Sequence, residues 1–178
     1  MRKSLFPLVL SAALLPAALL PATAFAADKA DITALQNAKV SMRDAISVAE
    51  KTGGGKAIDV TFDDDKGGTY DVTLIANDKT EHYSVPATMA NATATKSKDL
   101  MDKVDTESKG EKAALATAKV SLSEAIAKAE TSTSGKAIGG ELKTRNKLAV
   151  YEVDVIGGGD KVMQVSVDSM NGTATTKN

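Results

Sequence analysis

The chain has 178 residues, no cysteine, one histidine and only 3% aromatic residues. The lack of cysteine excludes disulfides, thiol nucleophiles and cysteine metal sites, and a single histidine excludes the His-x-x-x-His zinc pattern. The 22 basic and 23 acidic residues nearly balance. This argues against general nucleic-acid binding, which requires a basic surface.

The first 26 residues have the organisation of a secretory signal peptide. Arg2 and Lys3 form a positive start, Leu5 to Leu20 is apolar, and Ala24-Phe25-Ala26 is an Ala-x-Ala cleavage site. No later stretch is long and apolar enough to cross a bilayer, so no membrane span is expected after cleavage. The 22 basic residues then become 20 against 23 acidic ones, a net charge of −3. The sequence predicts a periplasmic or secreted protein.

The mature chain contains an internal duplication. Residues 38–58 recur at a constant offset of 80, so that Ser41 matches Ser121 and Lys56 matches Lys136. Such a shared spacing over about twenty positions indicates a repeated structural unit.

Each copy opens with a helix that its serine begins. Ser41 and Ser121 are predicted N-caps; Ser121 and Glu124 form a Ser-x-x-Glu capping box, whereas Asp44 makes a weaker version because its side chain is shorter. Behind each cap the apolar residues recur at i, i+3, i+4 and i+7, which gives one narrow stripe per helix. These residues are Met42, Ala45, Ile46 and Ala49, and Leu122, Ala125, Ile126 and Ala129.

Glycines and short segments flank these helices. Gly53-Gly54-Gly55 and Gly135 are predicted to end the helices, since glycine tolerates the left-handed turn of a C-cap. Residues 28–39 and 111–119 each predict a short lead-in helix before the main one.

Three strand candidates follow each main helix. In the first copy they are 57–62, 69–75 and 81–85, and in the second 137–143, 149–156 and 161–167. Their alternation of apolar and polar residues is typical of antiparallel strands with one buried face. A helix followed by a three-stranded meander must pack helix against sheet, which predicts an α+β fold. The two units, each near the lower size limit for independent folding, are expected to pack together by sheet edges or by faces.

Several motifs resemble the PepSY domain family. They are Val-Ser-Leu-Ser-Glu-Ala-Ile at 120–126, Gly-Lys-Ala-Ile at 135–138, Val-Tyr-Glu-Val-Asp-Val at 150–155 and Val-Ser-Val-Asp-Ser-Met-Asn-Gly at 165–172. The first copy is similar more loosely. The resemblance implies two tandem PepSY-like (cystatin-like) units: a divergent first domain at 28–95, a charged linker at 96–112 and a second PepSY domain at 113–178.

The sequence contains no catalytic constellation. No Gly-x-Ser-x-Gly elbow is present, and His82, the one histidine, lies in a predicted strand where it is expected to face solvent. The run Asp63-Asp64-Asp65 with Gly67 invites a calcium reading, but Leu74 occupies the position of the bidentate glutamate of an EF-hand, which favours a solvated turn. We expect no enzyme activity, no cofactor and no metal.

Four residues at matching positions are candidates for contact with a partner. Lys56 and Lys136 begin the first strand of each copy and either meet an acidic partner residue or are simply solvated. Tyr70 and Tyr151 lie in the middle strands, where their rings are expected to cover the helix with the hydroxyl at the edge.

The resemblance implies an exported, non-enzymatic module that binds a protein partner, an exported protease, and modulates or inhibits it. Exposed strand edges offer a mechanism, since one partner can add a strand to the other. The alternative is a periplasmic protein that binds a small ligand or a metal. The sequence sets no oligomeric state.

Overall fold

A computed structural model describes residues 29–64, 67–97, 108–145, 148–158 and 160–177. The predicted signal peptide lies outside these ranges. Residues 98–107 of the predicted linker do so as well, and there the apolar spacing that begins at Leu100 indicates a short amphipathic turn of helix. The helices are α1 (Lys29–Gln36), α2 (Met42–Gly53), α3 (Ser108–Thr117) and α4 (Leu122–Thr133). The strands are β1 (Lys56–Asp63), β2 (Thr69–Ala76), β3 (Lys79–Pro86), β4 (Thr95–Lys96), β5 (Lys136–Arg145), β6 (Leu148–Ile156), β7 (Val162–Asp168) and β8 (Ala174–Lys177).

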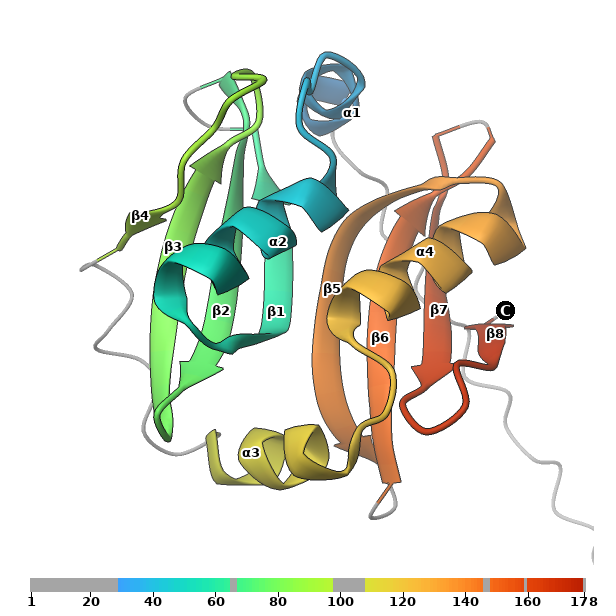
Figure 1. The fold of residues 1–178 in the computed structure, drawn as a ribbon. Coiled ribbons are helices and arrows are strands. Elements are labelled where there is room, and N and C mark those ends of the chain that lie inside the picture. Colours follow the sequence, from blue (N-terminus) through green and yellow to red (C-terminus); the bar gives the residue numbers. More distant parts are fainter. Residues whose placement is uncertain (1–28, 65–66, 98–107, 146–147, 159, 178) are drawn as a thin grey trace, which may run out of the picture.

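The strands form one antiparallel sheet in the order β4-β3-β2-β1-β5-β6-β7-β8, which confirms the α+β fold. Each half repeats the same order of elements, and the two halves join edge to edge through β1 and β5 (Figure 1). Each half also has a short fourth strand, β4 or β8, beyond the three predicted. The division of the chain into domains stays a prediction; β4 and α3 both reach into the predicted linker.

The join between the halves has the register of a two-fold axis. Val60 pairs with Gly140, its own counterpart 80 residues later, and Asp59↔Glu141 and Thr61↔Gly139 lie on either side. Such a reciprocal pattern is that of a self-complementary interface, here built within one chain. We call these three residue pairs the seam.

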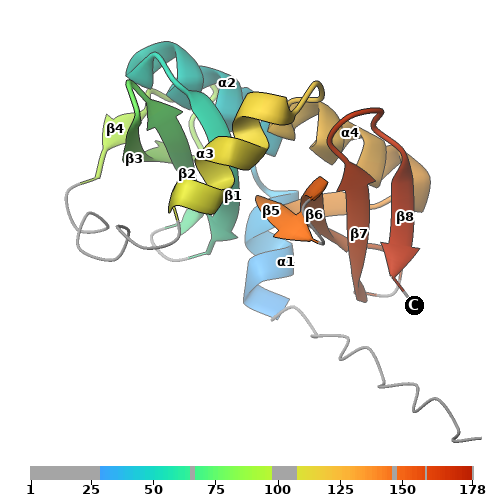
Figure 2. The same cartoon turned by 90° about the horizontal axis from the view of Figure 1, so that it is seen from below.

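Helices α2 and α4 cover one face of the sheet side by side (Figures 1 and 2). The predicted apolar stripes are confirmed, because all eight of their residues are buried. Four of them are alanines, which allow the helices to lie close to the strands. The shorter helices lie at the two ends of the seam, with α1 at the top and α3 at the bottom of Figure 1. The opposite face of the sheet is polar, and we call it the open face.

The helix caps follow the predicted difference between the copies. Ser41 and Ser121 each accept a hydrogen bond from the backbone N–H three residues on, at 3.2 Å. Glu124 also accepts from the Ser121 N–H at 2.8 Å and completes the capping box. At the other end Gly54 is left-handed (φ 68°) as predicted, but the second helix ends on left-handed Ser134 (φ 53°). The role predicted for Gly135 was therefore wrong.

Replacing Glu124 with alanine is expected to lower the free energy of unfolding by about 0.5–1 kcal/mol, because it removes the bond to the Ser121 N–H. Asp44→Ala, its counterpart, should cost less, since Asp44 instead accepts only from the Ser41 hydroxyl. Urea denaturation of both variants measures the difference. Equal losses would contradict the argument.

Candidate functional site on the open face of the sheet

Tyr70 and Tyr151 are fully buried beneath the helices. Their hydroxyls donate to the carbonyls of Val40 and Val120, at 2.9 and 2.7 Å. Burial raises the pKa of both phenols to about 12. The prediction that each ring lies beneath its helix is confirmed. Contact with a partner protein, the other role predicted for these tyrosines, requires exposed side-chain surface, and neither ring has any. Both tyrosines tie the middle strand of a half to the residue just before its helix cap.

The two matched lysines have different surroundings. The Lys136 ammonium donates a hydrogen bond to the carbonyl of Leu35 at 2.5 Å. It thereby caps the C-terminal turn of α1, where a positive charge interacts favourably with the helix dipole. The Lys56 side chain is 69% exposed and lies 3.6 Å from the Glu50 carboxylate. Of the four predicted contact residues, Lys56 is the one with substantial free surface.

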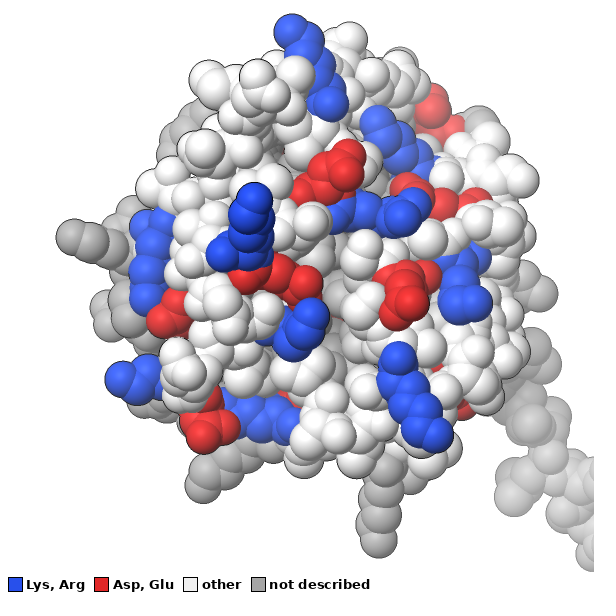
Figure 3. Space-filling model, viewed as in Figure 1, with Lys and Arg blue, Asp and Glu red and all other residues white. Residues whose placement is uncertain are grey.

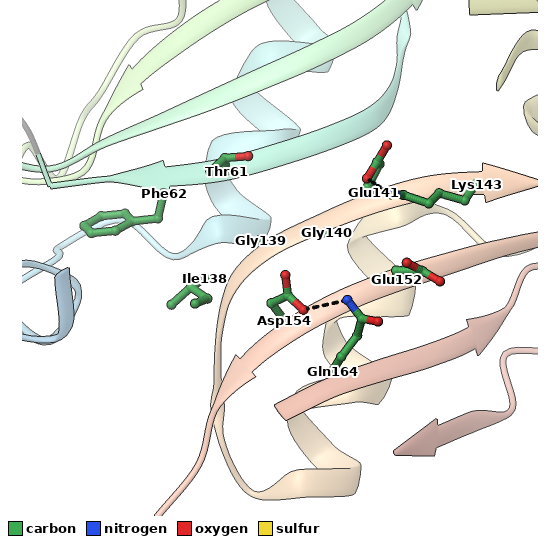
Figure 4. Close-up of a pocket in the computed structure, with 10 residues that line it drawn as sticks. All are labelled: Thr61, Phe62, Ile138, Gly139, Gly140, Glu141, Lys143, Glu152, Asp154 and Gln164. Carbon is green, nitrogen blue, oxygen red and sulfur yellow. Dashed lines mark hydrogen bonds and ion pairs between the residues drawn. The ribbon is translucent and has the colours of Figure 1, made fainter. Parts of the chain in front are cut away.

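A pocket of about 260 Å³ opens on the open face, over the seam and the strands beside it (Figure 4). Its floor is the backbone of Gly139 and Gly140, contributed by β5. A Cβ on Gly140 would point to the other face, 3.3–3.4 Å from Leu122 and Ile126 of α4. Its walls include Thr61 of β1 and a set of charged and amide side chains from β5, β6 and β7, namely Glu141, Lys143, Glu152, Asp154 and Gln164.

The polar walls of this pocket are held by one another. Glu152 is 8% exposed and forms ion pairs with Arg145 and with Lys177, the latter at 2.7 Å. Burial opposes the charge of Glu152, but the Lys177 hydrogen bond and the positive charges of Lys177, Arg145 and Lys143 outweigh burial and lower its pKa. Lys177 also donates to Gln164, which in turn donates to Asp154 at 3.1 Å. These contacts hold the polar side chains in fixed positions. A binding surface requires side chains that are ordered in this way.

Asp59 lies on the seam, opposite Glu141, which lines this pocket. Its pKa is raised to about 7, mainly by burial and then by the negative charges of Glu141, Glu111 and Asp71, against the opposing effect of Lys143. Sequence reasoning missed this residue. Its alternation with Ile58 and Val60 places it on the polar face, but no local pattern reveals that Glu141 lies opposite.

His82 faces away from α2 as expected, but it is buried and does not face solvent. Its Nδ1 lies 3.1 Å from the Thr73 hydroxyl, while Nε2 is buried and has no hydrogen-bond partner among the described residues. The expectation of a solvated histidine was wrong because a strand residue on the polar face can still be covered by its neighbours. Burial lowers the pKa of His82, and the nearby Asp71 charge only partly opposes this.

The pKa of His82 is lowered on folding, so the unfolded chain binds a proton at this imidazole before the folded chain does. The free energy of unfolding of the protein must therefore decrease as pH falls below about 6.5. His82→Gln should therefore lose less stability than the wild type between pH 7.5 and pH 5. Thermal denaturation at the two pH values measures the difference. An identical loss in both proteins would contradict the assignment of a buried neutral imidazole.

Within the described ranges, no group of three or more histidine and carboxylate side chains is placed to hold a metal ion. No helix of the same ranges combines the length and the apolar character needed to cross a bilayer.

Comparisons with known proteins give one family match. Residues 119–177 match the family described as PepSY, the peptidase propeptide and YPEB domain. No curated protein matches the chain significantly. Among solved structures, a candidate lipoprotein from Clostridium difficile 630 is similar over 79% of this chain and 93% of its own, with 16% identity and a TM-score of 0.44. A likeness at that level supports no conclusion about this chain.

Proposed function

We propose that this protein, which carries a PepSY domain at residues 119–177, is an exported, non-enzymatic module that binds a protease and restrains it in the periplasm or around the cell. The observation that carries the proposal is the family match itself, because the family includes peptidase propeptides. A fold alone does not establish an activity, and the surface that contacts a protease must therefore be formed by residues of this chain.

Two kinds of surface are available to a partner protein. The face formed by α2 and α4 carries interspersed positive and negative side chains (Figure 3), which suits a polar contact of mixed charge. The ends of the sheet offer a second surface. Within the described ranges, β4 pairs with only Tyr83 and Ser84 of β3, and β8 with Gln164–Val167 of β7. The remaining edge backbone of β3 and β7 supports recognition by strand addition.

Lys56 is the predicted contact residue that we retain. Its exposed ammonium lies near the C-terminal end of α2, within reach of an acidic side chain on a partner. Lys136 is already engaged with α1 and is proposed as structural.

The test uses the protein purified after export from its full-length gene. We expect it to slow at least one exported protease from its source organism and to recover that protease in a crosslinking pull-down. The proposal fails if no protease is slowed and none is recovered. For the contact residue, Lys56→Ala should weaken binding about fivefold, whereas Lys161→Ala, an exposed lysine at the far β6–β7 turn, should leave binding unchanged.

The small-ligand alternative has two pockets among the described residues in its support. The open-face pocket, at about 260 Å³, is below the range of roughly 300–1,000 Å³ typical of ligand sites. A pocket of about 410 Å³ between α1 and the start of β5, lined by Leu35 and Lys136 among others, lies within that range. A thermal-shift screen with metals, lipids and peptides separates the two functions, since a reproducible rise in melting temperature with a small molecule would favour the alternative.

A further inference from the structure

The seam is the shortest link between long strands in the sheet. It joins β1 to β5 through three residue pairs, whereas the β1–β2, β2–β3, β5–β6 and β6–β7 ladders each have at least seven. The two halves are also joined by the Lys136–Leu35 and Lys112–Asp78 hydrogen bonds of α1 and α3, and by contacts of α4 with α2 and β1. The seam is the place where a long strand of one half pairs with a long strand of the other.

The seam also has two side chains of like charge directly opposite each other. Asp59 pairs with Glu141 across the strands, and both belong to the polar open face. Like charges in this position destabilise a sheet. The two-fold axis provides an internal comparison, because the equivalent pair on its other side is Thr61 with Gly139. The seam is thus closed by neutral residues on that side, and the facing pair of acids occurs on the other side alone.

The surroundings of Asp59 are mostly negative. Besides Glu141, the groups that act on it are Glu111 from α3, Asp71 from β2 and one cation, Lys143 of β5. Lys143 is already shared, since its ammonium lies 2.8 Å from Glu141. Among the described residues that act on Asp59, three are carboxylates and one is a cation.

We propose that the pairing of β1 with β5 is proton-linked: a proton on Asp59 removes one of the two charges that face each other across the seam and closes it, and loss of that proton restores both charges and loosens the seam. The seam is then a pH-sensitive joint between the two halves of one sheet.

The direction follows from linkage. An aspartate whose pKa rises from 3.8 to about 7 on folding holds its proton in the closed seam over a range where the exposed carboxyl has lost it. The closed seam is therefore most stable below about pH 4 and weakens as pH rises towards 7. This is opposite in sign to the effect of His82, so the two groups can be separated by mutation.

Loosening the seam would expose the backbone edges of β1 and β5, which are the kind of edge that accepts an added strand. This consequence rests on the proposed function, whereas the proton linkage of the seam does not. If the linkage holds but no protease is bound, only the proposed function fails.

The test is amide hydrogen exchange of the whole exported chain by NMR at pH 5 and pH 8. At each pH we compare the protection of two sets of amides. The first set is the amides of residues 59–61 and 139–141 that bond across the seam, and the second is the amides of residues 72–74 in β2. In the wild type we expect the relative protection of the seam to fall about tenfold or more from pH 5 to pH 8. Asp59→Asn should abolish this fall, because its amide carries no charge at either pH.

Thr61→Ala, on the other side of the two-fold axis, is the matched control and should keep the wild-type fall. Glu141→Gln should reduce the fall without abolishing it, since burial of Asp59 remains; this variant carries the test if Asp59→Asn does not fold. The proposal is overturned if the wild-type seam is equally protected at both pH values. A tenfold fall that persists in Asp59→Asn, or one that Glu141→Gln leaves unchanged, overturns it as well.

Discussion

Replacing Tyr151 with alanine is expected to lower the free energy of unfolding by about 3–5 kcal/mol. The ring is fully buried between β6 and α4, so its removal leaves a cavity in the core of the second half. The change also leaves the Val120 carbonyl without the hydroxyl that donates to it at 2.7 Å. Since domains are stable by roughly 5–15 kcal/mol, the loss is a large fraction of the total. Urea denaturation at pH 7 measures it.

Two further variants separate the contributions at this position. Tyr151→Phe keeps the ring and removes only the hydroxyl, and we expect it to cost about 1 kcal/mol. Leu148→Ala removes a leucine that is 64% exposed on the same strand and should change stability by less than about 0.5 kcal/mol. A loss below about 1 kcal/mol for Tyr151→Ala would show that the ring does not fill the core as described.

Replacing Gly135 with alanine is expected to cost about 2–3 kcal/mol. An added Cβ would lie 2.5 Å from the carbonyl oxygen of Ile156, a backbone atom that cannot move aside without disturbing β6. The first half has the same restriction, because a Cβ on Gly55 would lie 2.5 Å from the Ile75 carbonyl oxygen. Neither glycine has a positive φ, so the cost is steric. Thermal and urea denaturation of Gly135→Ala and Gly55→Ala measure it.

Gly110→Ala is the matched control for the same change of side chain. Gly110 lies within α3, and, apart from its chain neighbours and the backbone of its own helix, no atom of the described residues lies within 4 Å of an added Cβ. Alanine there should raise the free energy of unfolding by about 0.5–1 kcal/mol, because it favours the helix. If Gly135→Ala proved as harmless as Gly110→Ala, the close approach of the helix end to β6 would be wrong.

The sequence by itself determined the repeated unit and the order of its elements. Local signals carry this information: Ser41 and Ser121 mark helix starts, the apolar spacing behind them marks the buried stripe, and alternation around Tyr70 and Tyr151 marks half-buried strands. Each of these signals acts over a few neighbouring residues, so it can be read without knowledge of what the element packs against. The motifs at 120–172 also predicted the family that matches residues 119–177.

Only the tertiary structure decided how the two copies meet and which side chains they bring together. Both an edge-to-edge and a face-to-face arrangement agree with the sequence, because strand periodicity fixes the buried face but not the neighbour at an edge. Asp59 and Glu141 are 82 residues apart, and their pairing follows from the two-fold register of β1 and β5. The burial of His82 likewise depends on neighbours outside its own strand. Pairing register between distant strands is set by the whole sheet, which is why the seam could not be predicted from local patterns.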